Sequence, residues 1–288
     1  MSFTLATFNT FWLFDNEEPL KRWGERLPEG GLEEKIRITA EAILSIGPNG
    51  PDIIALQEVE GPVTLDPLLE KLQEQDSAYR YFWCSDTLDP FTGQNVAVIS
   101  KHPISIKPVT RLDQTTLKYV DHREREKIGS LGKFLRVDLE VDDDIFTLFV
   151  VHLKSRRGGT ENTRLLREVQ GMIVRRLMRP RIEQGSPSSP CFVGVVGDFN
   201  DEPKTLPLDI IQGKRDTSYN LESATQGLPE EEKWTYIHND VKQQLDHILL
   251  NKFSHERIID AGFTRIDRTV SDHDAVWVTI DLKKQVTR

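Results

Sequence analysis

Residues 191–201 read Cys-Phe-Val-Gly-Val-Val-Gly-Asp-Phe-Asn-Asp. The first seven form an apolar run interrupted only by glycine, which is typical of a strand buried on both faces. The polar residues Asp198, Asn200 and Asp201 follow where that strand ends. Because α/β folds place their sites at the ends of core strands, this stretch predicts both a core strand and the position of a functional site.

The remaining pattern extends the same architecture in both directions. Further strands are predicted at 3–8, 51–56, 79–84, 95–100, 134–141, 145–151, 245–250, 258–263 and 275–282. Apolar residues recur at helical spacing at 32–46, 65–75 and 163–178. Strands with interspersed helices, including adjacent antiparallel pairs, indicate an α/β fold with mixed sheets and outer helices, in one domain over residues 1–288. The charged residues 112–132 are predicted to be a mobile surface loop that can overhang a site, and residues 213–233 a similar loop.

Composition narrows the class of protein. The 288 residues are 38% hydrophobic and 29% charged, as in soluble globular proteins with a substantial core. No apolar run approaches the roughly 18 residues of a membrane span, and the N-terminus has no signal-peptide pattern. We therefore expect a cytoplasmic protein with no stable membrane association, and no obligate protein partner is evident. Cys84 and Cys191 lie in apolar, strand-like contexts and are predicted to be buried free thiols.

The charge of the chain is uneven. A net charge of −9 argues against a dedicated nucleic-acid-binding module. From His152 to Arg181, however, nine Lys or Arg residues face only two Glu. A solvated helix face is one interpretation of this run. A surface that faces a polyanion is the other, because the run begins beside a candidate catalytic histidine.

Six short polar motifs occupy the predicted strand ends. They are Asn9, Gln57-Glu58, His152-Leu-Lys154-Ser155, Gly197-Asp-Phe-Asn-Asp201, Leu245-Asp246-His247 and Ser271-Asp-His-Asp274. Each motif alone is more readily explained as a turn, or as the point where a strand reaches the surface. Six of them in this order, each at a strand end, make coincidence improbable.

The chemical types in these motifs fit phosphodiester hydrolysis. Carboxylate and amide oxygens suit Mg²⁺ or Mn²⁺, and no cysteine cluster or His-Glu-x-x-His pattern indicates zinc. The reaction needs a metal to neutralise the phosphate, a base for the water and donors for the non-bridging oxygens. Glu58, with Asp272 or Asp198, can hold the metal.

Other motif residues can supply the remaining roles. Asp198 can orient or deprotonate the water, and Asn200 can donate an amide N–H to the phosphate. Asp246, paired with His273, would keep an imidazole protonated or in the required tautomer.

In order and type, the motifs resemble those of the endonuclease/exonuclease/phosphatase superfamily, over nearly the whole chain from Phe3 to Ile280. The resemblance implies a four-layer α/β sandwich, with two mixed central β-sheets flanked by helices and the site at one edge. It implies Glu58 as the main metal ligand, with Asn9 close by and Asp272 contributing.

The same resemblance implies the roles of the other motif residues. Asp198 would position or activate the attacking water, Asn200 and His273 would bind phosphate, and Asp246 would orient His273. His152 falls where members place a His or Tyr that contacts the phosphate or assists the leaving oxygen. Asn95 falls where a partner of that residue is often found, and the aromatic Trp234-Thr-Tyr236 matches a recurrent element that core packing explains equally well.

The choice of substrate depends on weaker signals. Asp201 and His247 stand where inositol polyphosphate phosphatases have basic residues, which disfavours that branch. The stretch 152–159 resembles bacterial nucleases, and the resemblance implies that Lys154, Arg156 and Arg157 contact backbone phosphates. The first expectation is an endonuclease with little sequence preference that cuts DNA, with RNA left open.

Two other functions stay open on the sequence. A phosphodiesterase or phosphatase for a small or lipid phosphoester, such as a sphingomyelinase-like enzyme, suits the acidic net charge, and Leu88-Asp-Pro-Phe91 is its only modest candidate for a membrane-facing loop. An inactive nucleic-acid-binding scaffold is disfavoured, because Glu58, Asp198 and His273 are all present.

Overall fold

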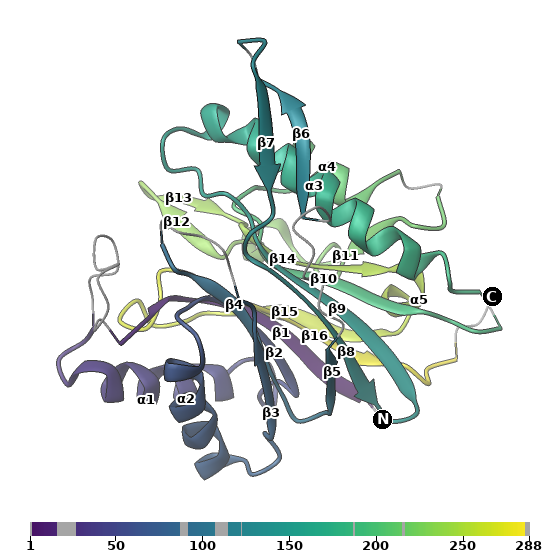
Figure 1. The fold of residues 1–288 in the computed structure, drawn as a ribbon. Helices are drawn as coiled ribbons and strands as arrows, with labels where there is room; N and C mark the ends of the chain where they lie inside the picture. The colour runs from purple at the N-terminus through teal and green to yellow at the C-terminus, as the bar shows by residue number, and fades with distance from the viewer. Residues whose placement is uncertain are drawn as a thin grey trace.

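Two six-stranded sheets lie face to face at the centre of the molecule (Figure 1). The computed structural model describes residues 2–15, 27–86, 92–106, 115–121, 123–186, 188–214 and 217–285. The strands of the first sheet are, in order, β15 (Ile258–Thr264), β16 (Ala275–Asp281), β1 (Ser2–Leu13), β2 (Ile53–Val59), β4 (Asn95–Ser100) and β3 (Tyr81–Cys84). Strands β1 and β2 are parallel and the other neighbours are antiparallel, so this sheet is mixed.

The second sheet repeats this plan. Its strands are, in order, β11 (Leu221–Ser223), β14 (Asp246–Asn251), β10 (Phe192–Asp198), β9 (Asp144–His152), β8 (Phe134–Val141) and β5 (Ile104–Ile106). The parallel pair is β9 with β10. The central strands of the two sheets are therefore parallel pairs that are largely buried on both faces. This explains the nearly continuous apolar runs of β2, β9 and β10 in the sequence.

Side-chain alternation along β1 shows how the layers form. Phe3 and Leu5 enter the core between the two sheets, whereas Ala6 and Phe8 enter the core between the first sheet and its helices. Successive residues of a strand point to opposite faces, so one strand supplies both cores. The burial of these apolar side chains is the main force that stacks the layers.

Helices cover the outer face of each sheet. Helices α1 (Gly31–Leu44) and α2 (Pro62–Gln75) pack on the first sheet, and α3 (Thr160–Ile182) and α4 (Leu206–Gln212) pack on the second. The short helices are η1 (Glu230–Glu232) and α5 (Lys252–His255). The order helix, sheet, sheet, helix confirms the predicted four-layer α/β sandwich with two mixed central sheets (Figure 1).

Two predicted loops contain strands that the sequence analysis missed. Residues 112–132 contain a hairpin of β6 (Thr116–Val120) and β7 (Glu126–Ser130), so the prediction of a mobile loop is wrong for the described part of this segment. The hairpin packs through Leu117 and Tyr119 on the core beside α3. Residues 213–233 contain β11 and η1, and a second small hairpin follows, of β12 (Tyr236–His238) and β13 (Val241–Gln243).

Several smaller expectations can now be compared with the structure. Cys84 and Cys191 are both free thiols as predicted, although only Cys191 is fully buried. Leu88–Phe91 falls outside the described residues. Among the helices that the structure describes, none is long and apolar enough to cross a membrane.

Candidate active site

Strand register brings three of the predicted residues side by side at one edge of the second sheet. Asp198, the last residue of β10, pairs with Asp246 on β14 and with His152 on β9. The tight approach of β9 and β10 requires a glycine before Asp198, because a Cβ on Gly197 would lie 1.9 Å from the carbonyl oxygen of Val151. The backbone φ of Gly197 is +137°, which side-chain-bearing residues rarely adopt.

Asp198 is a buried carboxylate that accepts three hydrogen bonds. Its Oδ1 accepts from the backbone N–H of Asn200 at 2.7 Å, and its Oδ2 accepts from the amide Nδ2 of Asn9 and of Asn200, both at 3.1 Å. Burial, followed by the charge of Asp246, raises the pKa of Asp198 to about 7. A carboxylate that titrates near neutral pH is well suited to act as a general base.

Asn200 has a different role from the predicted one. The sequence analysis assigned its amide N–H to the phosphate, but its Nδ2 donates to the carbonyl of Leu153 at 3.2 Å and to Asp198. Both amide hydrogens are engaged in this arrangement, so Asn200 orients the Asp198 carboxylate instead. The backbone φ of Asn200 is +50°, a left-handed conformation that asparagine tolerates better than most residues.

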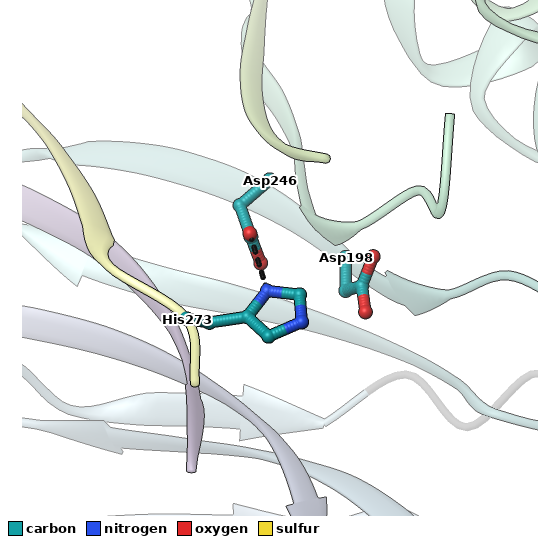
Figure 2. A group of neighbouring side chains, drawn as sticks. All are labelled: Asp198, Asp246 and His273. Atoms are coloured by element: carbon teal, nitrogen blue, oxygen red, sulfur yellow. Dashed lines mark hydrogen bonds and ion pairs between the residues drawn. The ribbon is translucent and has the colours of Figure 1, made fainter. Parts of the chain in front are cut away.

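Asp246 and His273 form a buried pair, as predicted (Figure 2). Nδ1–H of His273 donates to Oδ2 of Asp246 at 2.7 Å. Burial acts to lower the pKa of His273, but the Asp246 carboxylate outweighs it and, with Asp198 and Asp272, raises that pKa to about 10. The imidazole is therefore protonated at neutral pH, and it carries a positive charge into a site of carboxylates.

Glu58 lies at the end of β2 in a left-handed conformation, with a φ of +61°. Phe11 and Trp12, opposite it at the end of β1, are also left-handed, and such residues cost about 1–3 kcal/mol each when they are not glycine. The backbone N–H of Trp12 donates to Oε2 of Glu58 at 3.3 Å, and that of Phe11 donates to Oδ1 of Asn9 at 3.0 Å. The strained backbone thus orients both predicted ligands.

The carboxylates of Glu58 and Asp272 are the type of donor that a divalent cation prefers. Burial raises the pKa of both, and the charge of Asp272 raises that of Glu58 further. Both side chains are partly buried, and carboxylates near one another are stabilised when a cation lies between them. With the amide oxygen of Asn9, they form an all-oxygen set that fits Mg²⁺ or Mn²⁺.

A second group could hold a metal on distance alone. Asp198, Asp246 and His273 each have a ligand atom within 4.8 Å of the others. A metal ligand must be a neutral imidazole, whereas the Asp246 contact keeps His273 protonated. The metal ligands Asn9, Glu58 and Asp272 therefore stay a prediction, and the second group is a hydrogen-bonded acid–base cluster beside them.

His152 lies between the two groups. Its Nε2 is 3.5 Å from Oδ2 of Asp198 and 3.9 Å from Oε1 of Glu58. Burial, followed by the charges of Lys133, His273 and Lys154, holds its pKa well below the usual value, so the ring is neutral. The Asn95 amide donates to the carbonyl of Glu60 at 2.8 Å, and no described residue hydrogen bonds to Nδ1 of His152, so the partnership of Asn95 with this ring stays a prediction. A role for Asn95 in substrate binding stays a prediction.

Part of the basic run after His152 forms hydrogen bonds and ion pairs inside the protein. Arg156 binds the carbonyl of Asn200 at 2.8 Å and forms ion pairs with Asp201 and Glu202. Arg167 is fully buried and binds Asp201 at 2.8 Å. These contacts brace the Asn200 turn, which differs from the predicted contact of Arg156 with substrate phosphates. Lys154 and Arg157 are exposed beside the site.

Three side chains near the site were not assigned a role by the sequence analysis. Lys35 on α1 is buried beneath the ends of β1 and β2. The sequence signal that could have marked it is a lysine next to the apolar face of that helix. Lys133 donates to Gln94 and its charge acts on Glu58 and His152, but nothing in its sequence context marks it. The ring of Tyr236, which belongs to the predicted aromatic element, lies 5.0 Å from that of His273.

Comparisons with known proteins agree with this architecture. The model of the Endonuclease/Exonuclease/phosphatase family matches residues 6–273. A truncated TDP2 from Caenorhabditis elegans is similar in structure, with a TM-score of 0.61, 17% identity and 97% of each chain covered. A protein of the same family from Leptotrichia buccalis has a TM-score of 0.59 and 19% identity, over 97% of this chain and 99% of that one.

The catalytic domain of human nocturnin, solved with a bound sulfate anion, has a TM-score of 0.56 and 19% identity, over 97% of this chain and 94% of that one. No curated protein matches the chain. At these identities, the similar structures show the shared fold alone.

Proposed function

Because the chain belongs to the endonuclease/exonuclease/phosphatase family, whose members hydrolyse phosphoester bonds, we propose that it is a metal-dependent phosphodiesterase that cuts DNA internally with little sequence preference. The observation that supports the chemistry most strongly is the matched register of His152, Asp198 and Asp246, with His273 bonded to Asp246. This arrangement sets a carboxylate with a raised pKa beside a protonated imidazole, the pair that water attack on a phosphodiester requires.

The metal would be held by Asn9, Glu58 and Asp272, and Mg²⁺ or Mn²⁺ fits their oxygen donors. When bound, the ion supplies positive charge that neutralises the phosphate and stabilises the charge that develops on its oxygens.

The side chains of the chain itself would divide the remaining work. Asp198 takes a proton from the attacking water, and Asn9 and Asn200 hold that carboxylate in place. The imidazolium of His273 donates Nε2–H to a non-bridging phosphate oxygen, while Asp246 fixes its orientation through Nδ1. The neutral ring of His152 carries one N–H, which it can donate to the phosphate or to the leaving oxygen.

The proposal that the substrate is a nucleic acid rests on the exposed cations beside this centre. Lys154 and Arg157 are exposed and follow His152 directly in the chain, where flanking phosphates of a strand would pass. Contacts of this kind do not depend on base sequence, which is why little sequence preference is proposed. RNA presents the same phosphate diester and is a substrate to compare with DNA.

A specific observation supports the second candidate, a phosphodiesterase for a small or lipid phosphoester. Arg156 and Arg167 both pair with Asp201, so the run of nine basic residues provides less external positive charge than its sequence indicates. The net charge of −9 also opposes a long polyanion.

One assay separates the two candidates. Supercoiled plasmid, a short single-stranded RNA and a chromogenic phosphodiester are each incubated with Mg²⁺ and with Mn²⁺, before and after chelation with EDTA. Nicking of the plasmid by the wild type, and none by Asp198→Ala or after chelation, supports the proposed endonuclease. Turnover of only the small diester would support the second candidate, and full activity after exhaustive chelation would exclude the metal assignment.

A further inference from the structure

Lys35 is a buried lysine that the proposed chemistry does not use. It lies on α1 and is 1% exposed. Its Nζ donates to the carbonyl of Thr10 at 3.0 Å and to that of Val270 at 2.6 Å. Transfer of an ammonium group out of water is unfavourable, and an apolar side chain would pack on this helix face without that penalty. The ammonium must therefore contribute something that an apolar side chain cannot.

The first carbonyl belongs to the segment that carries Asn9. Thr10 follows Asn9 directly, and its hydroxyl donates to the carbonyl of Gln57 at 2.9 Å and to that of Glu58 at 3.3 Å. Lys35 thus anchors the residue that ties the end of β1 to the end of β2. These are the two strand ends that carry two of the proposed metal ligands.

The second carbonyl belongs to the segment that carries Asp272 and His273. Val270 precedes Ser271, whose hydroxyl donates to the carbonyl of Asn9 at 2.7 Å and accepts from the backbone N–H of His273 at 3.0 Å. One ammonium group therefore holds the β1 end and the segment before β16 against each other. No other described side chain donates to both segments in this way.

The anchored backbone is also the strained part of the site. Phe11, Trp12 and Glu58 all have φ between +51° and +61°. Such conformations persist where surrounding contacts fix the chain on both sides. The Lys35 bond to Thr10 fixes the residue immediately before Phe11, and it does so from the interior, where water cannot replace it.

We propose that Lys35 is a positioning residue, whose buried ammonium group clamps together the three strand ends that carry Asn9, Glu58 and Asp272. The reaction that this clamp serves rests on the proposed function, but the clamp itself is a statement about the geometry of the ligand set. It predicts that loss of the Lys35 hydrogen bonds disperses the ligands.

The charge of Lys35 and its hydrogen bonds predict opposite effects on metal binding. If Lys35 acted only as a nearby positive charge, its removal would tighten the binding of a divalent cation, because the carboxylates would lose a competing cation. If Lys35 positions the ligands, its removal weakens binding. Loss of residues that orient metal ligands typically weakens affinity about 10- to 100-fold.

The test measures Mn²⁺ affinity by isothermal titration calorimetry, with kcat and KM measured on the same preparations. Lys35→Met is compared with the wild type, with Lys35→Arg, which keeps the donors and the charge, and with Asp138→Asn. Asp138 is a buried polar residue of β8 that accepts from Thr147, away from the site, and its variant controls for general destabilisation. We expect Lys35→Met to raise the Kd for Mn²⁺ about 10-fold or more and to lower kcat more than it changes KM, and we expect Lys35→Arg to restore part of both.

An unchanged or tighter Mn²⁺ affinity in folded Lys35→Met would overturn the proposal. If Lys35→Met does not fold, Lys35→Gln is tested in its place, because it retains one amide donor without the charge. Weaker Mn²⁺ binding by this variant supports the proposal, and unchanged or tighter binding overturns it. A wild type that cleaves no phosphodiester, yet binds Mn²⁺ more tightly than Lys35→Met, would refute the proposed function and leave the positioning role of Lys35 supported. A wild type that binds no Mn²⁺ would refute the role of Lys35 along with the metal assignment.

Discussion

Oδ2 of Asp246 lies 2.7 Å from Nδ1 of His273, and both side chains are buried at the edge of the two sheets. Asp246 begins β14 and His273 precedes β16, so the pair joins the second sheet to the first. The contact fixes the ring by one nitrogen and leaves Nε2 as the donor that a substrate can use. It also keeps the ring protonated, since the Asp246 charge outweighs the effect of burial.

Asp246→Asn should separate the orientation of His273 from its charge. The amide can still contact the ring, but it removes the carboxylate that raises the pKa of His273 to about 10. We expect kcat to fall about 100-fold or more, and the alkaline limb of the pH–rate profile in Mg²⁺ to move to lower pH, because the imidazolium is lost earlier as the pH rises.

The matched control for this change is Asp274→Asn. Asp274 is equally buried, but it pairs with Arg265 and Arg268 instead of His273. The Asp274→Asn variant should leave the alkaline limb of the pH–rate profile at the wild-type pH, even if it lowers the free energy of unfolding. An alkaline limb that stays at the wild-type pH in Asp246→Asn would show that His273 is not the group that must be protonated.

Asp198→Asn should increase stability relative to the wild type as the pH rises. The folded protein raises the pKa of Asp198 from 3.8 to about 7. Between these values the unfolded chain releases the proton and the folded chain retains it, so the wild type loses stability as the pH increases. The neutral asparagine does not titrate.

The measurement for Asp198→Asn is the free energy of unfolding by urea, in EDTA, at pH values from 4 to 8. The variant minus wild-type difference should become more favourable to the variant from about pH 4 to pH 7 and then level off. The trend is the prediction, since the lost carboxylate contacts add an offset that does not vary with pH. A difference that stays flat over this range would show that Asp198 is ionised throughout and is not a base tuned to neutral pH.

The strand-end residues of the site were predictable, and so was the Asp246–His273 pair, whereas the partners of the long basic side chains were not. A strand is a local pattern, so the sequence shows that Asp198 and Asp246 lie at strand ends. Register then brings them together. The partner of a long side chain depends on contacts far along the chain, as for Arg167 and Asp201, which are 34 residues apart. For this reason a run of positive charge was interpreted as a surface where the structure has an internal brace.

The same limit explains the missed β6–β7 hairpin. Its strands mix charged and apolar residues, with Val120 and Ile128 exposed and Leu117 and Tyr119 packed on the core, so the apolar alternation is weak. The hairpin depends on α3, since a Cβ on Gly129 would lie 2.5 Å from Cγ1 of Val169. A close contact between segments 40 residues apart leaves only an isolated glycine as a signal in the sequence.

The brace predicts a large difference between two arginines on α3. Arg167 is fully buried, and its removal leaves the Asp201 carboxylate without one of its buried partners. We expect Arg167→Met to lower the free energy of unfolding by about 3–5 kcal/mol in a denaturant titration. Arg164→Met should lower it by less than about 1 kcal/mol, because Arg164 is exposed and its ion pairs with Glu161 and Glu168 are i,i+3 and i,i+4 pairs along one helix. Equal losses in the two variants would contradict the internal role of Arg167.

Variants of the exposed cations beside His152 test whether the substrate is a nucleic acid. Each phosphate contact steepens the dependence of log K on log salt by about 0.9 for duplex DNA. In an Asp198→Ala background that cannot cut, Lys154→Gln with Arg157→Gln should therefore flatten the slope by roughly 1.8. Binding is measured by fluorescence anisotropy with a labelled duplex, between 50 and 200 mM salt.

The control for the slope is Lys252→Gln with Lys283→Gln, which makes the same change of net charge at the opposite ends of β14 and β16. This pair should weaken binding slightly through the overall field and leave the slope within error of the parent. If both double variants change the slope equally, the attraction is a general effect of charge and the 152–159 segment is not the DNA-facing surface. If neither changes it, the small or lipid phosphoester becomes the better-supported substrate, because the cations at the site entrance would then contact no flanking phosphates.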